Sequence, residues 1–229
     1  MFYRLKENDH GLAYDPFKSC VVPRPIGWIS TMSIDNVPNL APYSQFQILT
    51  FDPPYVMFAA NQKTNGSRKD SVVNAEQTKE FVYNLATYDL REAVNISAQE
   101  VPPVVDEFDL AGVGKLSSKI VKPYRVKESP AQYECRYHQT LRLRGSSVIG
   151  TVDVVIGEVL AVHIKDEFIM PDGKLDIIRM KPLGRLGYYD YTCVESVFEM
   201  AIPGSNEELR AGMEGKVVEK SDNSKNENT

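Results

Sequence analysis

The sequence is poor in the residues that mark disulfide-bonded, membrane and metal-binding proteins. Its 229 residues include only three cysteines, three histidines and one tryptophan. Cys20, Cys135 and Cys193 are odd in number, lie far apart and form no CxxC pair, which favours reduced thiols over a disulfide framework. No apolar run reaches the ~18 residues that a bilayer crossing requires, and the N-terminus lacks an apolar stretch of signal-peptide length. We therefore expect a cytoplasmic protein without a membrane partner.

Familiar catalytic and nucleotide-binding motifs are also missing. The sequence contains no GxSxG, HExxH, P-loop or GxGxxG pattern. His10, His138 and His163 are too widely spaced for a local metal motif, so we predict no metal site. Carboxylates are scattered, and no nucleophile stands out. This inventory favours a protein in which a bound cofactor carries the chemistry.

Charge and composition describe an ordinary globular protein with no electrostatic preference for nucleic acid. Lys and Arg together number 26, against 31 Asp and Glu, which gives a net charge of -5. A mildly acidic chain provides no general attraction to DNA, RNA or anionic membranes. Residues 206–229 are mostly polar and contain few groups that a core could bury. We expect one domain over residues 1–205, followed by a mobile polar tail over 206–229.

Alternating and Val/Ile-rich segments predict a body rich in strands with a few helices. Strands are expected over 26–34, 43–50, 55–60, 80–86, 132–143 and 147–164, and helices over 67–78 and 87–99. Residues 101–130, with several prolines and glycines, are expected to be irregular. The segment 147–164 is too long for one flat strand, and Gly150 and Gly157 predict bulges of the kind that help small barrels close. Strand–helix alternation is absent, which favours a mainly β barrel of the α+β type.

Two segments carry hydroxyls and cations that suit a phosphate-bearing planar ligand. Segment 23–31 ends in Ser30 and Thr31, which can donate to phosphate or ribityl oxygens, although both are also ordinary strand residues. Segment 67–71 (SRKDS) opens an expected helix, where free N–H groups and the helix dipole favour an anion. A simple helix start is an equally good interpretation of that second segment.

Two further segments are candidates for contacts with such a ligand. In 39–44 (NLAPYS), Pro42 fixes the backbone and Ala41 leaves room for a flat ring, whereas a hairpin strand with a core tyrosine is the alternative. Segment 180–191 combines two glycines, two cations and three tyrosines. It has the composition of a loop that closes over a ligand or contacts a second subunit, and a simple surface loop is the alternative.

In their order and spacing, these segments resemble the flavin reductase-like, FMN-binding split-barrel family. The resemblance extends over roughly residues 15–201 and is carried by RPIGWIST at 24–31, NLAPYS at 39–44, DPP at 52–54, KDS at 69–71 with Asn74, FVYNL at 81–85, IGEV at 156–159 and the segment 179–187. It implies a six-stranded antiparallel split β-barrel with inserted helices. It also implies a homodimer with one FMN per subunit, reduced by NADH or NADPH.

The resemblance also implies site residues for the flavin. Those expected near the phosphate and ribityl chain are Ser30, Thr31, Lys69 and Ser71. Those expected along the isoalloxazine are Ala41, Pro42, Tyr43 and Ser44, with Asn61 close to the flavin and Trp28 walling the site. The bulky pair Tyr188-Tyr189 departs from the small residues that many relatives have there.

Three functions are therefore open from the sequence. The first is an NAD(P)H-dependent flavin reductase, in which hydride passes from the nicotinamide to the flavin without a protein nucleophile. The second is an FMN-binding electron carrier that a protein partner reduces, which the bulky Tyr188-Tyr189 pair suggests. The third is a flavin-free binding protein on the same barrel.

Overall fold

The computed structural model describes residues 1–200, 203 and 215. The chain divides into two units, Met1–Ser196 and Val197–Thr229. The described residues of the second unit, which are 197–200, 203 and 215, form no helix or strand. The predicted domain boundary at 205 lies outside the described residues, as does the predicted tail apart from Gly215. The rest of the description concerns the first unit.

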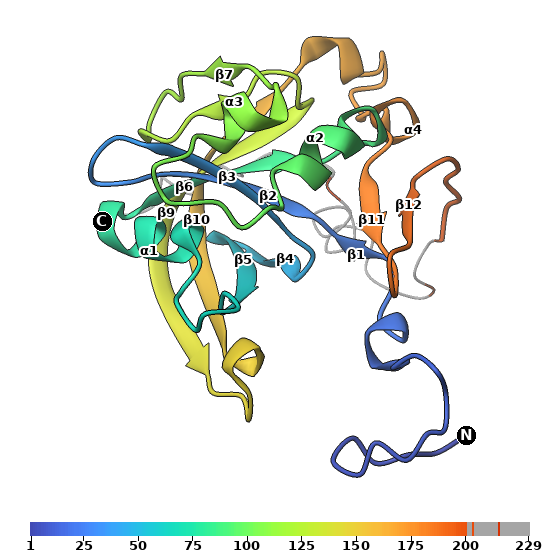
Figure 1. Ribbon diagram of the computed structural model, residues 1–229. Coiled ribbons are helices and arrows are strands. Elements are labelled where there is room, and N and C mark those ends of the chain that lie inside the picture. Colours follow the sequence, from blue (N-terminus) through green and yellow to red (C-terminus); the bar gives the residue numbers. More distant parts are fainter. Residues whose placement is uncertain (201–202, 204–214, 216–229) are drawn as a thin grey trace, which may run out of the picture. The chain divides into compact units, whose positions relative to one another are not determined.

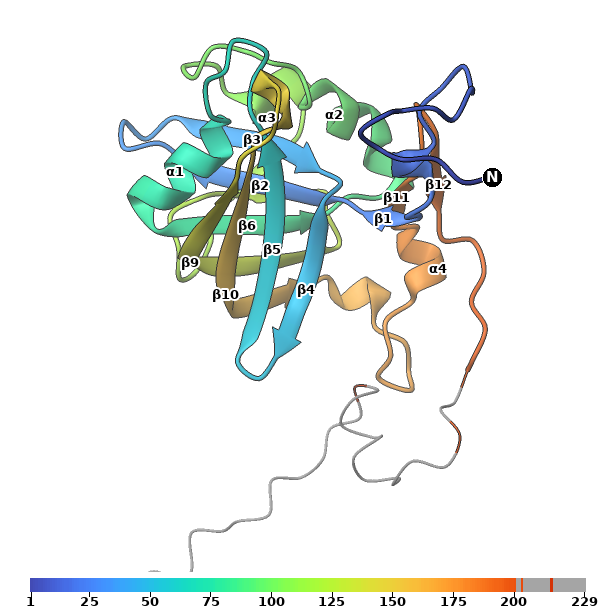
Figure 2. The ribbon, with the colours of Figure 1, turned by 90° about the horizontal axis from the view of Figure 1, so that it is seen from below.

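Seven antiparallel strands form one sheet in the order β3-β2-β6-β9-β10-β5-β4 (Figure 1). Their bounds are β2 Gly27–Met32, β3 Pro38–Tyr43, β4 Phe46–Phe51, β5 Pro54–Asn61, β6 Glu80–Leu85, β9 Ala131–Leu143 and β10 Val152–Ile164. Figure 2 shows β9, β10, β5 and β4 side by side, running across β2 and β6, so the sheet is strongly curled. The mainly β class predicted from the sequence is confirmed.

The predicted six-stranded barrel is wrong in strand number and in closure. The sheet has seven strands, and its outer strands β3 and β4 are not neighbours in the described pairing. The additional strand is β3 over residues 38–43, which the strand pattern does not predict. The segment expected as a strand over 43–50 is β4, which begins only at Phe46, after a break that follows Tyr43. Both side chains enter the same core cluster. Residues three apart point to opposite faces of a straight strand, so the chain must turn between them.

Shorter elements surround this sheet. Strands β1 Arg24–Pro25, β11 Leu183–Arg185 and β12 Tyr191–Cys193 form a second sheet, and β7 Lys115–Leu116 pairs with β8 Arg125–Val126. The α-helices are α1 Asp70–Thr78, α2 Arg91–Ile96, α3 Glu107–Ala111 and α4 Ile177–Met180. Short 3-10 turns cover Phe17–Ser19, Tyr88–Leu90, Val148–Gly150 and Asp166–Phe168. Among the described residues, no helix has the length and apolar character that a bilayer crossing requires.

Helix α3 interrupts the region that the sequence predicts as irregular. The Asp106 side chain accepts a hydrogen bond from the Phe108 N–H at 2.9 Å, which caps the start of the helix. Gly112 ends it at a φ of 68°, a left-handed conformation that glycine adopts without strain. Phe108 is fully buried. A helix this short is fixed by its caps and by one buried aromatic, so hydrophobic periodicity does not reveal it.

Strand β10 carries the predicted irregularity at Gly157. Its pairing with β9 shifts register between Ile156 and Gly157. A Cβ atom at Gly157 would lie 2.2 Å from Cε1 of the buried Phe81, so only glycine allows this close approach. Gly150 lies instead in a 3-10 turn before the strand.

Two apolar cores lie on opposite faces of β2. Ile29 belongs to one core and its neighbour Trp28 to the other, as strand alternation requires. Helix α1 contributes Val72 to the first core, whereas α2 and α3 contribute to the second. All six residues of β2 are therefore buried.

A buried carboxylate on β9 fastens the loop that follows β7. Glu134 is fully buried and accepts hydrogen bonds from the backbone N–H groups of Lys119 at 2.8 Å, Ile120 at 2.6 Å and Val121 at 3.0 Å. Its Oε1 also lies 2.5 Å from Nε2 of His163. Burial by itself would raise the pKa of Glu134. The bonds from Lys119, His163 and the other two N–H groups outweigh it and lower the pKa to about 2.

Replacing Glu134 by glutamine should destabilise the protein in a pH-dependent way. We expect Glu134→Gln to lower the free energy of unfolding at pH 7 by about 1–3 kcal/mol, because a neutral amide weakens charge-assisted bonds and places a donor among donors. The folded pKa lies below the ordinary value of 4.5. The carboxylate's contribution is therefore present above pH 4.5 and is lost as the pH falls toward 2.

Denaturant unfolding of the wild type and the variant from pH 7 to pH 2.5 measures this effect. The difference in stability should shrink below pH 4.5. Glu158→Gln, which removes a carboxylate paired with Arg136 on the surface, is the control and should have a small effect. A difference for Glu134→Gln that stays constant over the whole pH range would contradict this account.

Candidate functional site

A small pocket lies between the end of β3, the start of α1 and the segment that links α2 to α3. Its volume is about 60 Å³, and it is lined by Asn39, Ala41, Pro42, Tyr43, Lys63, Lys69, Asp70, Ser71, Ser97, Ala98, Gln99, Glu100, Val101 and Glu107. Pockets that enclose a whole small ligand measure roughly 300–1,000 Å³. This one has room for a group the size of a phosphate, so a larger ligand must extend beyond it.

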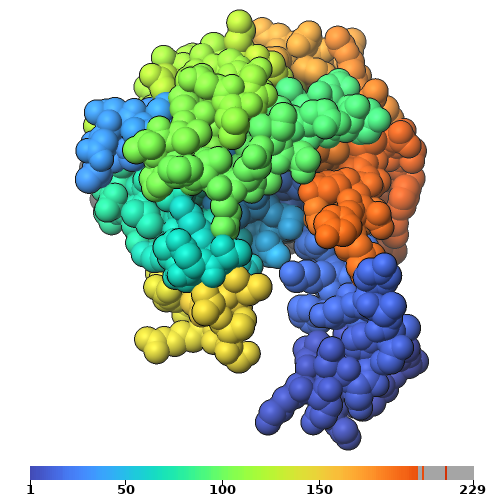
Figure 3. All heavy atoms as spheres, in the orientation of Figure 1, coloured from blue at the N-terminus to red at the C-terminus, as the bar shows by residue number. Residues whose placement is uncertain are grey.

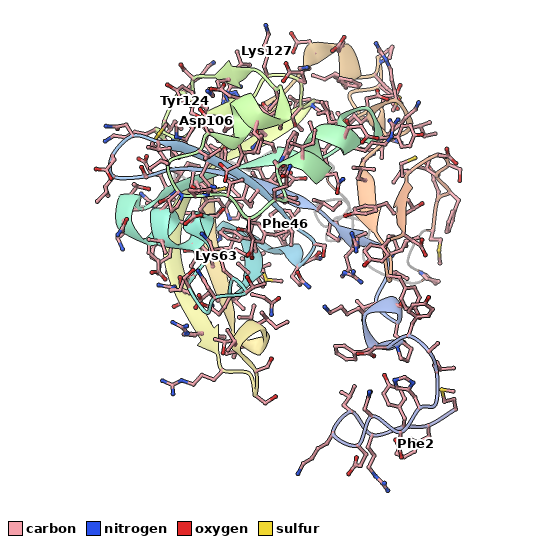
Figure 4. All side chains as sticks on the ribbon, in the orientation of Figure 1. Phe2, Phe46, Lys63, Asp106, Tyr124 and Lys127 are labelled. Atoms are coloured by element: carbon pink, nitrogen blue, oxygen red, sulfur yellow. The ribbon has the colours of Figure 1, made fainter. Side chains whose placement is uncertain are left out.

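The surface near this pocket is hollowed. Figure 3 shows a depression between the green segment that follows α2 and the orange β11–β12 hairpin, with blue atoms of the early strands at its floor. Figure 4 labels Lys63 in the loop that leads to α1 and Phe46 at the start of β4. The polypeptide leaves β3 at Tyr43 and enters β4 at Phe46, so the 39–44 segment ends in this region.

Two lysines bring positive charge to the pocket, and each is paired with a carboxylate. Lys63 Nζ lies 2.7 Å from Oδ2 of Asp70, and Lys69 Nζ lies 2.5 Å from Oε1 of Glu100. Lys69 immediately precedes α1, and its side chain does not cap the helix. The first-turn N–H groups of α1 therefore lie beside a lysine, and together they suit an anionic group.

A buried polar network supports the floor of the pocket. Asn39 Oδ1 accepts hydrogen bonds from the hydroxyls of Thr31 at 3.0 Å and Ser71 at 2.7 Å. Asn39 Nδ2 donates to Oε1 of Glu107 at 2.8 Å, and Oε2 of Glu107 accepts from the Leu40 N–H at 3.1 Å. The network therefore joins β2, β3, α1 and α3 around one asparagine.

Burial shifts the pKa of two acidic groups at the pocket. It raises the pKa of Tyr43, despite a hydrogen bond with Ser71, so the phenol stays neutral and can donate. Burial also raises the pKa of Glu107, against the lowering effect of its bonds from Leu40 and Asn39. The pocket therefore presents the neutral phenol of Tyr43 as well as the two lysines.

Half of the predicted flavin-binding residues line this pocket, namely Ala41, Pro42, Tyr43, Lys69 and Ser71. Trp28 and Ser30 are fully buried and serve other contacts. The Trp28 Nε1–H donates to Oγ of Ser97 at 2.9 Å, so Trp28 anchors a wall of the pocket from behind. The Ser30 hydroxyl donates to the carbonyl of Tyr124, which Figure 4 labels.

The remaining predicted residues lie in three different places. Thr31 belongs to the Asn39 network, where Nδ2 of Asn74 donates to its hydroxyl at 3.1 Å. Ser44 is half-buried and follows β3 directly. Asn61 is exposed at the end of β5, and its Nδ2 donates to the carbonyl of Ile149 at 2.8 Å. A role for any of these side chains in flavin binding stays a prediction.

Sequence reasoning missed several pocket residues. Three of them, Lys63, Glu100 and Glu107, belong to separate segments of the chain, and no local sequence pattern identifies them as pocket residues. Asn39 belongs to the 39–44 segment, but its role as a network centre depends on partners far along the chain. Arg68 was grouped with Lys69 in the SRKDS segment, yet its guanidinium is held by Glu76, with two contacts of 2.6 Å, and does not line the pocket.

A larger pocket lies between α2 and the β11–β12 hairpin. Its volume is about 570 Å³. Arg91 lies 4.2 Å from the ring centre of Tyr88, and Arg185 lies 4.4 Å from that of Tyr191. The segment 180–191 runs from the last residue of α4 through β11 to the first residue of β12, and its Arg185 and Tyr191 form a cation–aromatic pair. Tyr189 is 91% exposed at the edge of this pocket.

Comparisons with known proteins place this architecture among flavin-associated split barrels. Residues 19–181 match the flavin reductase like domain. An uncharacterized protein of Aquifex aeolicus is 35% identical over 191 residues, which cover 82% of this chain and 94% of that protein. The chain belongs to the flavin reductase-like domain family.

Solved structures agree with this assignment of the fold. Nitrilotriacetate monooxygenase component B from Bacillus cereus is 27% identical with a TM-score of 0.79, covering 87% of this chain and 98% of that one. A split-barrel protein from Shewanella frigidimarina, assigned as a flavin reductase, is 18% identical with a TM-score of 0.73 over 88% and 99%. An FMN-binding protein from Thermus thermophilus is 16% identical with a TM-score of 0.66 over 87% and 99%.

Removing the centre of the polar network should destabilise the protein. We expect Asn39→Ala to lower the free energy of unfolding by about 2–4 kcal/mol, because it leaves polar groups of Thr31, Ser71 and Glu107 buried without their partner. Asn95→Ala replaces an exposed asparagine on α2 and should change stability by less than about 0.5 kcal/mol. Denaturant titration of the two variants makes the comparison, and equal stabilities would contradict the role assigned to Asn39.

Proposed function

We propose that this protein is an FMN-binding flavin reductase that uses NADH or NADPH as electron donor. The observation that carries the proposal is the pocket at Lys69 and the start of α1, which adjoins the 39–44 segment in a chain of the flavin reductase-like family. The pocket suits the phosphate, and the adjoining segment suits the flat ring. The flavin-free binding protein gains no support from this arrangement.

The residues present fit the phosphate of FMN in size and in polarity. Lys69 and Ser71 at the start of α1 would hold the phosphate, because a cation, a hydroxyl and free N–H groups meet there. At about 60 Å³ the pocket accepts the phosphate alone. The ribityl chain and ring would lie outside it, against Pro42, Tyr43 and Ser44.

Bound FMN supplies the electron acceptor for the hydride of a reduced nicotinamide nucleotide. The residues of the chain would bind the flavin and the nicotinamide nucleotide and orient them toward each other. The neutral hydroxyl of Tyr43 can donate to a ligand, and the Asn39 network keeps the floor of the pocket fixed while the ligand binds. No side-chain nucleophile is required, in agreement with the absence of a catalytic triad motif.

We also propose that the protein acts as a homodimer. The β4–β5 hairpin and the neighbouring part of β10 line an apolar surface groove of about 420 Å³. Ile48, Phe51 and Val162 are exposed there by 55%, 76% and 52%. Exposed apolar side chains that gather on one face mark an interaction site. A second copy of the chain is the partner that the resemblance to the family implies.

Reduction of the flavin by a nicotinamide nucleotide tests the proposed activity directly. Anaerobic mixing of the purified protein with FMN and NADH, and separately with NADPH, should bleach the visible absorption band of the flavin. The controls are the same mixtures without protein. No bleaching with either nucleotide, in protein that binds FMN, would exclude a reductase.

An electron carrier fed by a protein partner is the second candidate. Tyr188, with a left-handed φ of 55°, and the exposed Tyr189 give the β11–β12 hairpin a bulky tip, which is the observation that favours it. A carrier should retain FMN in equal amount to the protein and oxidise neither NADH nor NADPH. Fast nucleotide oxidation that depends on added free FMN would exclude this candidate.

Lys69 should contribute to affinity through the phosphate of the flavin. We expect Lys69→Ala to raise the FMN dissociation constant about ten- to a hundredfold, because one charge-assisted contact contributes roughly 1.5–3 kcal/mol. Riboflavin, which has no phosphate, should bind both proteins equally. Lys127→Ala, at an exposed lysine labelled in Figure 4, is the control. An FMN dissociation constant that Lys69→Ala leaves unchanged would show that Lys69 does not contact the phosphate.

A further inference from the structure

Glu100 holds the lysine that the proposed function assigns to the flavin phosphate. Its Oε1 lies 2.5 Å from Nζ of Lys69, and its Oε2 accepts a hydrogen bond from the Thr64 hydroxyl at 3.3 Å. The Lys69 and Glu100 side chains are 26% and 38% exposed. Both line the pocket. The carboxylate therefore sits at the mouth of the pocket and neutralises its cation.

The segment that carries Glu100 is fastened at one end. Ser97 is buried, accepts the hydrogen bond from Trp28, and donates to the carbonyl of Val94 at 3.0 Å. Glu100 follows three residues later and is exposed. Figure 1 shows the light-green segment between α2 and α3 crossing in front of β2 and β3. The side chain can leave Lys69 without disturbing the buried anchor at Ser97.

The other ion pair of the pocket is built differently. Asp70 pairs with Lys63 and is the first residue of α1, and the two side chains are 21% and 13% exposed. Its backbone is fixed by the helix, and the Lys63 N–H donates to the carbonyl of Ser67 at 2.8 Å. Of the two pairs, only that of Lys69 and Glu100 has a carboxylate on an exposed segment outside regular structure.

We propose that Glu100 is a specificity-determining residue of the flavin site. Its carboxylate is paired with Lys69 in the free protein, and it therefore competes with the flavin phosphate for the same ammonium group. This inference rests on the proposed function. Binding of a phosphorylated flavin must break the Lys69–Glu100 pair, whereas binding of riboflavin need not. Glu100 therefore weakens the binding of FMN relative to that of riboflavin.

The expected size of the effect follows from the exposure of the pair. Partly exposed ion pairs contribute up to about 1 kcal/mol, which corresponds to about fivefold in affinity. We expect Glu100→Gln to tighten FMN binding about two- to fivefold at low ionic strength. The gain should decrease as salt is added, because screening weakens exposed pairs. Riboflavin affinity should not change.

Titration of flavin fluorescence with purified wild type and Glu100→Gln, using FMN and riboflavin in parallel, measures these affinities. Glu158→Gln removes a different carboxylate, which lies 2.7 Å from Arg136 on the sheet, and should change neither affinity. Unfolding curves confirm that each variant is folded. An unchanged FMN affinity, or an equal change for both flavins, would overturn the proposal.

The double variant Lys69→Ala/Glu100→Gln tests whether Glu100 acts through Lys69. In the Lys69→Ala background, Glu100→Gln should tighten FMN binding by a smaller factor than in the wild type, because the competition for the cation is gone. An equal factor in both backgrounds would overturn the competition. Failure of the wild type to bind FMN at all would instead overturn the proposed function, so the two failures are distinguishable.

Discussion

Burial of β2 on both faces is the constraint on which the candidate site depends. A strand between two apolar cores has no water for its polar side chains, so each must find a partner inside the protein. Ser30 bonds to the loop after β7, and Thr31 bonds to Asn39. Asn39 also bonds to Ser71 on α1 and to Glu107 on α3. The hydrogen bonds that the polar side chains of β2 require thus also fix the start of α1 and the start of α3, which both line the pocket.

The sequence predicts the strands well because their side chains alternate against buried faces. Its errors occur where a second rule competes. Tyr43 and Phe46 serve one core at a spacing that a straight strand cannot provide, and α3 depends on the cap at Asp106 more than on periodicity. The side chains of Ser30 and Thr31 show that the sequence alone cannot assign the partner of a strand hydroxyl. A hydroxyl on a strand serves a ligand or an interior network equally well, and only the facing partner distinguishes them.

The charges of the pocket could not be predicted from the sequence for a related reason. Local reasoning found Lys69 and Arg68 beside the start of a helix, where cations favour an anion. In the folded protein, Arg68 pairs with Glu76 and Asp153, and Lys69 pairs with Glu100. Lys63, from the loop that precedes α1, pairs with Asp70. A motif specifies which charges are present, whereas their mutual pairing depends on segments that meet only in space.

The size of the pocket connects the proposed flavin site with the proposed dimer. A volume of about 60 Å³ leaves the ring of a flavin outside, on the surface beyond Tyr43. The chain continues from there into β4, where Phe46 is buried and Ile48, Leu49 and Phe51 are exposed. One strand therefore begins beside the proposed ring position and then presents apolar side chains to the outside. A flat ring on an open surface stays in contact with water, and a second subunit seated on this strand would cover both the apolar side chains and the ring.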